Sequence, residues 1–269
     1  MREEPVLIDR DGAVLTLTLN APQRRNALSL AMRSALADSL EDAEGDQAIR
    51  AVILTGAGEH FCSGGDLTDM AVETLAEGRE RMRRSHRAIR LMVRARFPII
   101  AAVEGWCAGA GLSLASASDH VVAGRGARFV ASFGRVGLIP DFGLLHTLPA
   151  RIGLGRAREI LLFGETIDAA RAEAIGLVDR VVEAGQALAA ARQRAALLVE
   201  KAPLSLALTK AALASGIEDA LAREQDVQAA LYLTPDHAEG REAFLAKRPP
   251  RFGEGPVSAK DRSVPGSDR

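Results

Sequence analysis

The chain has 269 residues, of which 48% are apolar and 26% are charged, and its formal net charge is −1. A chain of this length and composition can bury a large core and suits one domain with an appendage. The balanced charge argues against a protein drawn to nucleic acid by its overall charge, although local basic patches are not excluded. Two cysteines, Cys62 and Cys107, are too few for a disulfide framework, so we expect a reduced, cytoplasmic setting.

The sequence shows neither the pattern of a signal peptide nor that of a membrane-spanning segment. The chain begins MREEP, without the basic start and apolar run of a signal peptide. No uninterrupted apolar stretch reaches the ~18 residues that a membrane span needs. We therefore expect no membrane association.

The first two-thirds of the chain alternates short strands with helices. Residues 6–9 and 14–19 predict a hairpin around an Asp-Gly turn, because the second segment alternates Leu with Thr at the period of a half-buried strand. A helix is expected over residues 29–46, with Ser29 as its N-cap. The same reasoning predicts strands at 51–55, 99–103, 120–123 and 128–130, and helices at 75–94 and 109–116.

Helical patterns alone fill the last third of the chain. They cover residues 144–152, 156–163, 169–175, 186–201, 204–215, 217–232 and 237–247. An alternating region followed by helices predicts an α/β core with a helical C-terminal appendage. We place the core at residues 1–200, a helical region at 201–252, and a disordered tail, rich in Gly, Pro, Ser and charge, at 253–269.

Two glycine-rich turns carry the main functional signal. Residues 61–67 read FCSGGDL after the strand at 51–55, and residues 105–111 read GWCAGAG after the strand at 99–103. Small residues let the backbone approach a ligand, and free N–H groups at a helix start favour negative charge. Two such groups on one oxygen make an oxyanion hole. Tight packing without chemistry is the alternative. A phosphate loop does not fit, because no Gly-Lys-Ser/Thr follows.

Taken together, the turns resemble the signature of the crotonase (enoyl-CoA hydratase/isomerase) family. That signature is a Gly-Ala/Gly-Asp-Leu/Ile turn followed farther along by Pro-x-x-Ala-x-Val-x-Gly-x-x-x-Gly-Gly-Gly. Here residues 98–105 read PIIAAVEG and continue to GAG at 109–111. QRRNAL at 23–28, AIGLV at 174–178, and Phe244 with Lys247 also match. The resemblance covers roughly residues 6–252.

The resemblance implies a spiral of ββα units with a C-terminal helical trimerisation region, assembled as a trimer or a dimer of trimers. It implies an acyl-CoA substrate, with no metal and no cofactor beyond the coenzyme A that the substrate carries. The backbone N–H groups of Gly65 and Ala110 would hold the thioester oxygen. Ala110 replaces the usual Gly, but the role needs only an N–H. Substrate-binding positions implied by the match are Arg24, Ala27, Leu28, Ser63, Asp66, Leu67, Ser113, Phe133, Phe244 and Lys247.

The family match places one carboxylate in this pocket. Hydratases of the family use two glutamates around a water, and the matching positions here are Ser113 and Phe133, which cannot accept a proton at neutral pH. Asp141, within GLIPDFG at 137–143, remains. The run from 133 to 143 is most similar to ring-1,2-epoxyphenylacetyl-CoA isomerases, which carry an Asp there. Apolar neighbours such as Leu138 and Phe142 would raise the pKa of Asp141 and make it a useful base.

A single base suits double-bond migration, so the sequence favours an isomerase over a hydratase. The structural alternative for Asp141 is an Asx-type turn after Pro140. A 4-chlorobenzoyl-CoA-type dehalogenase would use the same Asp with a histidine, and His86 falls near that place, although a solvated His86 is the simpler interpretation. Ser113 lacks the Gly-x-Ser-x-Gly setting of a hydrolytic nucleophile. Cys62 and Cys107 are interpreted as small packing residues.

A non-catalytic acyl-CoA-binding or RNA-binding member of the family is the remaining alternative. A cluster of six arginines lies within the helix at 75–94, and no aromatic residues for base stacking lie between them. We interpret this helix as a solvated face, with a contribution to coenzyme A phosphates next, and expect no nucleic-acid partner. The six are Arg79, Arg81, Arg83, Arg84, Arg87 and Arg90.

Overall fold

The computed structural model describes residues 4–253. The predicted disordered tail lies, from residue 254 on, outside the described residues. No helix in the part that is described is long and apolar enough to cross a membrane.

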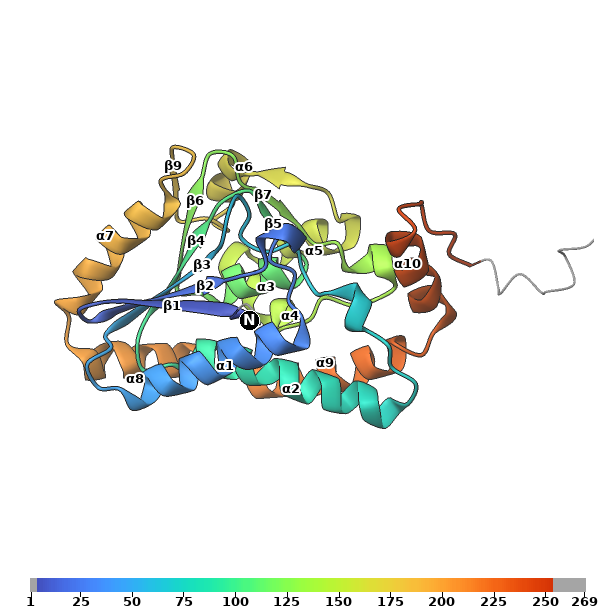
Figure 1. The fold of residues 1–269 in the computed structure, drawn as a ribbon, viewed down its shortest axis with the longest axis horizontal. Coiled ribbons are helices and arrows are strands. Elements are labelled where there is room, and N and C mark those ends of the chain that lie inside the picture. The colour runs from blue at the N-terminus through green and yellow to red at the C-terminus, as the bar shows by residue number, and fades with distance from the viewer. Residues whose placement is uncertain (1–3, 254–269) are drawn as a thin grey trace, which may run out of the picture.

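A six-stranded sheet forms the centre of the molecule, with the strand order β1-β2-β3-β4-β6-β9 (Figure 1). Strands β1 (Val6–Asp11) and β2 (Val14–Leu19) form the predicted antiparallel hairpin. The remaining strands run parallel to β2 and are β3 (Ala51–Gly56), β4 (Ile99–Val103), β6 (His120–Gly124) and β9 (Arg180–Val182). A second sheet of three short strands contains β5 (Trp106–Ala108), β7 (Arg128–Val130) and β8 (Ile167–Asp168).

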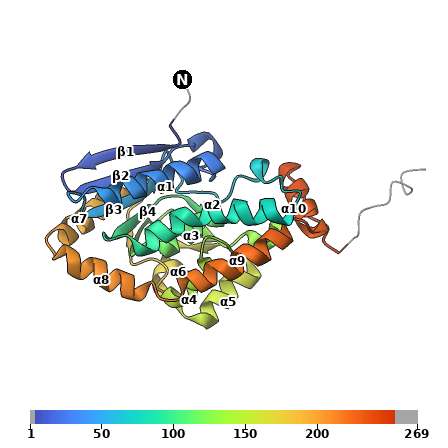
Figure 2. The ribbon, with the colours of Figure 1, turned by 90° about the horizontal axis from the view of Figure 1, so that it is seen from below.

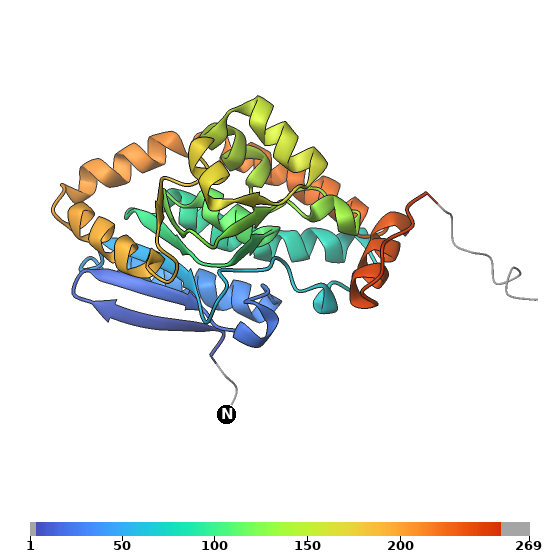
Figure 3. The same ribbon diagram turned by 90° about the horizontal axis from the view of Figure 1, so that it is seen from above.

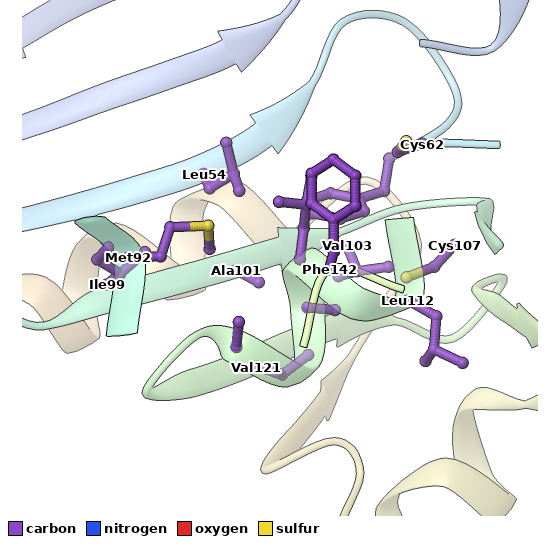
Figure 4. Packing of buried hydrophobic residues seen from close by; sticks show 14 of the residues in the cluster. Leu54, Cys62, Met92, Ile99, Ala101, Val103, Cys107, Leu112, Val121 and Phe142 are labelled. Atoms are coloured by element: carbon purple, nitrogen blue, oxygen red, sulfur yellow. The ribbon is translucent and has the colours of Figure 1, made fainter. Parts of the chain in front are cut away.

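Helices cover both faces of the large sheet, which explains why its central strands are apolar throughout rather than alternating. Along β3, Ala51 and Ile53 pack with the alanines of α7 (Ala187–Val199), whereas Val52 and Leu54 belong to the main core. That core lies under α1 (Leu30–Gly45), α2 (Leu75–Arg94) and α3 (Ala110–Ala117). Figure 4 shows its centre, where side chains of β3 and β4 meet those of α2 and α3.

The remaining helices follow in chain order and wrap the core. They are α4 (Leu144–Ile152), α5 (Leu154–Phe163), α6 (Ala169–Ala174), α8 (Pro203–Leu213), α9 (Ile217–Leu231) and α10 (Pro235–Leu245). Helix α9 lies along α2 (Figure 2). Helix α10 lies at the opposite end of the molecule from α7 and α8 (Figure 3). There it packs on two single-turn helices, η2 (Leu67–Asp69) and η3 (Phe133–Val136).

The predicted α/β core with helices after it is confirmed, and most boundaries agree to within two or three residues. Three strands were missed: β5, β8 and β9. Each has only two or three residues, which leaves little alternating pattern to recognise, although the equally short β7 was predicted. The predicted turn at 105–111 therefore contains a strand, β5, and helix α3 begins directly after it at Ala110.

Candidate active site

The two glycine-rich turns meet at one edge of the sheet. Their parent strands β3 and β4 are parallel neighbours, so both turns leave the sheet at its carboxyl edge. The backbones of Cys62 and Cys107 form an isolated parallel β-bridge, and the N–H of Ala108 donates to the carbonyl of Cys62 over 2.9 Å. A Cβ on Gly111 would lie 2.4 Å from the Cys62 carbonyl oxygen, and one on Gly64 would lie 3.2 Å from that of Ala108. Glycine at these positions is what lets the turns touch.

Each turn contributes one residue, Gly65 or Ala110, to the lining of a single cavity of about 180 Å³. Ala110 is the first residue of α3, so its N–H has no acceptor within the helix. The N–H of Gly65 likewise has no backbone acceptor among the described residues. The positive end of the α3 dipole points to the same place. The pair can therefore donate to one oxygen on which negative charge develops, as an oxyanion hole requires.

Asp141 lines the same cavity and is 4% exposed. Its Oδ1 has no hydrogen-bond partner among the described residues, while Oδ2 accepts from Gln228 Nε2 over 3.4 Å. Burial raises the pKa of Asp141 to about 7, the negative charge of Glu224 adds to the rise, and the Arg33 guanidinium opposes it. A carboxyl with such a pKa can both accept and release a proton near neutrality.

The remaining walls of the cavity are mostly apolar. They come from the end of the first turn, from η2 and η3, and from α10. Asp141 is the only carboxylate among the described residues that line it. Phe244 is 62% exposed and lines the cavity from α10. The other lining residues are Ser63, Gly64, Leu67, Met70, Gly109, Ser132, Phe133, Arg135, Val136 and Leu138.

The turn that carries Asp141 has an unfavourable backbone. Phe142 has φ +55° and Gly143 has φ +70°, so a bulky residue and a glycine are left-handed in succession. Such a conformation at a non-glycine residue costs about 1–3 kcal/mol. Packing offsets this cost, because the Phe142 ring points into the core beside Val103 (Figure 4) and the Arg33 guanidinium lies 5.0 Å from its centroid.

Of the substrate-binding positions that the family match implies, Ser63, Leu67, Phe133 and Phe244 line the cavity. Others lie just outside it. Arg24 is exposed and forms an ion pair of 2.9 Å with Asp66. Leu28 is buried, and its N–H donates to the Gly64 carbonyl over 2.8 Å, with half-buried Ala27 beside it. The segment at 24–28 thus supports the first turn through its backbone.

Two further positions are not brought to the cavity. Ser113 is buried inside α3, and its hydroxyl donates to the helix's own Gly109 carbonyl over 3.3 Å. Lys247 is exposed after the end of α10, with its N–H donating to the Phe244 carbonyl over 3.1 Å. Ser113 therefore faces the protein interior, and Lys247 lies three residues beyond the Phe244 that lines the cavity.

The interpretation of His86 as a solvated side chain is wrong. His86 is 0% exposed, and its Nε2 lies 2.7 Å from Glu224 Oε1 on α9. Sequence reasoning also missed Glu224 and Gln228, which contact the Asp141 turn from one face of α9. Their spacing of four residues was the available signal, but only the structure shows that this face is buried.

Five of the six clustered arginines on α2 are paired with acidic side chains at the surface, as a solvated face predicts. Arg81 is the exception, because it is buried and donates to Asp69 over 2.8 Å. The two cysteines are buried packing residues. Burial raises the pKa of Cys62 to about 12 and that of Cys107 well above its ordinary value, so both thiols are neutral.

Comparison with known proteins identifies the family. The model of the enoyl-CoA hydratase/isomerase family matches residues 9–255, nearly the whole chain. The chain belongs to this family, also called the crotonase family, and is an enzyme of the kind that acts on acyl-CoA thioesters.

The similar proteins include one named as an isomerase and others named as hydratases. The chain is 37% identical to the 1,2-epoxyphenylacetyl-CoA isomerase of Escherichia coli K12, covering 93% of this chain and 98% of that protein. It is 38% identical to a probable enoyl-CoA hydratase of Rhodobacter capsulatus, covering 88% and 93% of the two chains. A solved enoyl-CoA hydratase from Mycobacterium avium subsp. paratuberculosis superposes with a TM-score of 0.84 at 32% identity, covering 92% of this chain and 98% of that one. The predicted crotonase fold is confirmed.

The raised pKa of Asp141 predicts a pH-dependent cost in stability. The folded protein retains a proton that the unfolded chain releases, so stability falls as pH rises from about 4 to about 7. Asp141→Asn removes this cost. The difference in free energy of unfolding, Asp141→Asn minus wild type, should therefore be about 2–3 kcal/mol larger at pH 8 than at pH 5. Urea unfolding at both pH values measures this difference.

Asp42→Asn, at an exposed carboxylate on α1, is the control. Parallel curves for wild type and Asp141→Asn would contradict the burial of an ionisable Asp141.

Proposed function

We propose that this chain is an isomerase that moves a carbon–carbon double bond in an enoyl-CoA thioester. One observation carries the proposal: Asp141 is the only carboxylate among the described residues lining the cavity that Gly65 and Ala110 also line. Hydration by this family's two-glutamate arrangement needs a second carboxylate to manage the water. Isomerisation needs one.

The chemistry follows from these groups. The thioester oxygen accepts hydrogen bonds from the N–H groups of Gly65 and Ala110, which stabilise the enolate. Ionised Asp141 removes a proton from the acyl chain, and the C–H electron pair becomes part of the conjugated enolate. The protonated carboxyl then returns the same proton two carbons away, and the enolate electrons form that new C–H bond. The double bond has moved, Asp141 is ionised again, and no cofactor is consumed.

Hydration is the second candidate, because several relatives of similar identity are named hydratases. The two positions that hold hydratase glutamates are occupied by Ser113 and Phe133. The Phe133 side chain lines the cavity, and the Ser113 hydroxyl is bonded to a helix carbonyl. Neither is a base at neutral pH, which supports isomerisation over hydration. A panel of acyl-CoAs assayed separately for the two reactions distinguishes them.

Dehalogenation has less support than either. It would need a histidine near Asp141 to activate water, and His86 does not line the cavity. Its Nε2 is bonded to Glu224 instead. An RNA-binding role would use the α2 arginines, which are paired with acidic side chains of this chain. A non-catalytic acyl-CoA-binding role rests on the absence of both hydratase glutamates. Asp141 Oδ1, which has no hydrogen-bond partner within residues 4–253, favours a catalytic protein.

An aromatic or ring-containing acyl group suits the cavity. Leu67, Phe133 and Leu138 supply apolar walls, and a relative at 37% identity is named as an isomerase of 1,2-epoxyphenylacetyl-CoA. The coenzyme A portion would extend past exposed Arg24 and Lys247, whose positive charges suit its phosphates. This substrate class rests on the shape of the site and on the relative's name.

Self-association as a trimer, or as a dimer of trimers, completes the proposal. Leu204 and Leu208 lie four residues apart on α8 and are 68% and 62% exposed, and Leu213 on the same helix is also exposed. Apolar side chains gathered on one helix face commonly mark an interface. Leu221, another of the apolar residues in the C-terminal helices, belongs instead to the core.

Asp141→Asn tests the proposed function directly. The amide keeps the size of the side chain and removes its basic site, so isomerase turnover should fall at least about a hundredfold with nearly unchanged affinity for acyl-CoA. Ser113→Ala should cost far less, because that hydroxyl transfers no proton. Steady-state kinetics with matched binding measurements give the comparison. Equal losses in the two variants, or an active Asp141→Asn, would place the base elsewhere.

Light scattering tests self-association. We expect a trimer or hexamer at micromolar concentration, and a shift toward monomer in the double variant Leu204→Glu, Leu208→Glu, because two charges would be buried in the interface. The matched control is Leu162→Glu, which changes an exposed leucine on α5. A wild-type protein that is only monomeric would rule out the proposed assembly.

A further inference from the structure

Behind Asp141 lies a buried carboxylate that the proposed chemistry does not use. Glu224, on α9, is buried, and both of its oxygens are engaged. Oε1 lies 2.7 Å from His86 Nε2, and Oε2 accepts from the N–H of Gly143 over 2.8 Å. Glu224 does not line the cavity that contains Gly65 and Ala110. Any effect of Glu224 on the site is therefore exerted through the Asp141 turn.

Helix α9 holds the backbone on both sides of Asp141. Glu224 binds Gly143, two residues after Asp141. One helical turn later, Gln228 accepts from the N–H of Ile139 over 3.1 Å and donates to the Ile139 carbonyl over 3.3 Å. Gln228 also donates to Asp141 Oδ2 over 3.4 Å. The left-handed turn is thus fixed at residues 139 and 143, with Asp141 between them.

Holding the turn does not by itself require a charge. A glutamine at position 224 has the same length and could accept the Gly143 N–H equally well. A buried carboxylate is costlier than a buried amide, and a second carboxylate beside Asp141 makes the ionised pair costlier still. His86 Nε2 lies 2.7 Å from Glu224 Oε1 and in the Nε2–H tautomer donates to it, although Nδ1 has no partner among the described residues. A negative charge kept at this cost points to an electrostatic effect on Asp141.

The ionisable groups around Asp141 act in opposite directions. Burial raises the pKa of Asp141 most, and Glu224 raises it further. Arg33 from α1 and Arg81 from α2 lower it. Tyr232, just beyond α9, is neutral because burial raises its own pKa to about 12. Asp69 is paired with Arg81 over 2.8 Å, and Glu224 is the negative charge whose effect on the pKa of Asp141 opposes that of the two arginines.

We propose that Glu224 is a positioning residue: fixed by His86, it holds the turn that presents Asp141, and its charge makes Asp141 the stronger base. This inference rests on the proposed role of Asp141 in proton transfer. The charge favours the protonated form of Asp141, so it promotes removal of the substrate proton. The hydrogen bond from Gly143 to Glu224 fixes the end of the turn on which Asp141 lies. Two substitutions separate these effects.

Glu224→Gln keeps the contact with Gly143 and removes the charge. Glu224→Asp keeps the charge and withdraws it from Gly143 by one methylene. Asp226→Asn, at an exposed residue of α9 paired with Arg79, removes a negative charge of the same helix at the surface and is the control. The ¹³Cγ resonance of Asp141, assigned by its loss in Asp141→Asn, is titrated in the ligand-free proteins. Isomerase kcat and kcat/KM are measured against pH.

In Glu224→Gln the Asp141 midpoint should fall by about one pH unit, and the acid limb of kcat/KM should move with it. In Glu224→Asp the midpoint should stay near that of wild type while kcat falls about tenfold, because the base is misplaced. Asp226→Asn should change neither. A wild-type midpoint in Glu224→Gln, or a wild-type kcat in Glu224→Asp, overturns the inference. If Glu224→Gln does not fold, the kcat of Glu224→Asp alone decides whether Glu224 positions Asp141.

The role of Glu224 and the isomerase function are tested by different measurements. An active Asp141→Asn removes Asp141 from the reaction, yet the ligand-free titration still reports whether Glu224 shifts its midpoint. An inactive Asp141→Asn together with an unshifted Glu224→Gln leaves the isomerase proposal intact and overturns the role of Glu224.

Discussion

Two glycine-rich turns can touch in this molecule only because glycine leaves no Cβ at the points of contact. A Cβ on Gly111 would lie 2.4 Å from the Cys62 carbonyl oxygen, a distance that no side chain tolerates. The parallel pairing of β3 with β4 places both turns at one edge of the sheet, and the missing side chains close the remaining gap. Gly65 and Ala110 consequently line the same cavity. Everything proposed for the site depends on this contact.

Asp141 operates under opposing constraints. Its surroundings must be apolar enough to keep water from the enolate, yet an isolated buried carboxylate would remain protonated and could not act as a base. Arg33 and Arg81 favour the ionised form, while burial and Glu224 favour the protonated form. The balance near neutrality lets one group take a proton and return it. The strained turn at Phe142 is held by packing against Arg33 and by two side chains of α9.

The sequence was sufficient for most of the fold. Strand and helix periods predicted the α/β core, whereas Gly65, Ala110 and Asp141 were indicated by the family resemblance, and all three line one cavity. What it missed depends on contacts distant in the chain. His86 lies on an arginine-rich helix that looks solvated by its own pattern, and its partner Glu224 is 138 residues away. Ser113 matches a family position, but its place inside α3 turns the hydroxyl away from the cavity. Strands of two or three residues, such as β8, carry too little pattern.

A crystal structure with a bound, unreactive acyl-CoA analogue tests the central claim most directly. The account predicts that the thioester oxygen lies about 3 Å from the backbone nitrogens of both Gly65 and Ala110. It also predicts that Asp141 Oδ1 lies within about 3.5 Å of a carbon that exchanges a proton, with no ordered water between them. A thioester bound elsewhere, or a water held by a different side chain at the acyl double bond, would contradict a reaction run by one carboxylate.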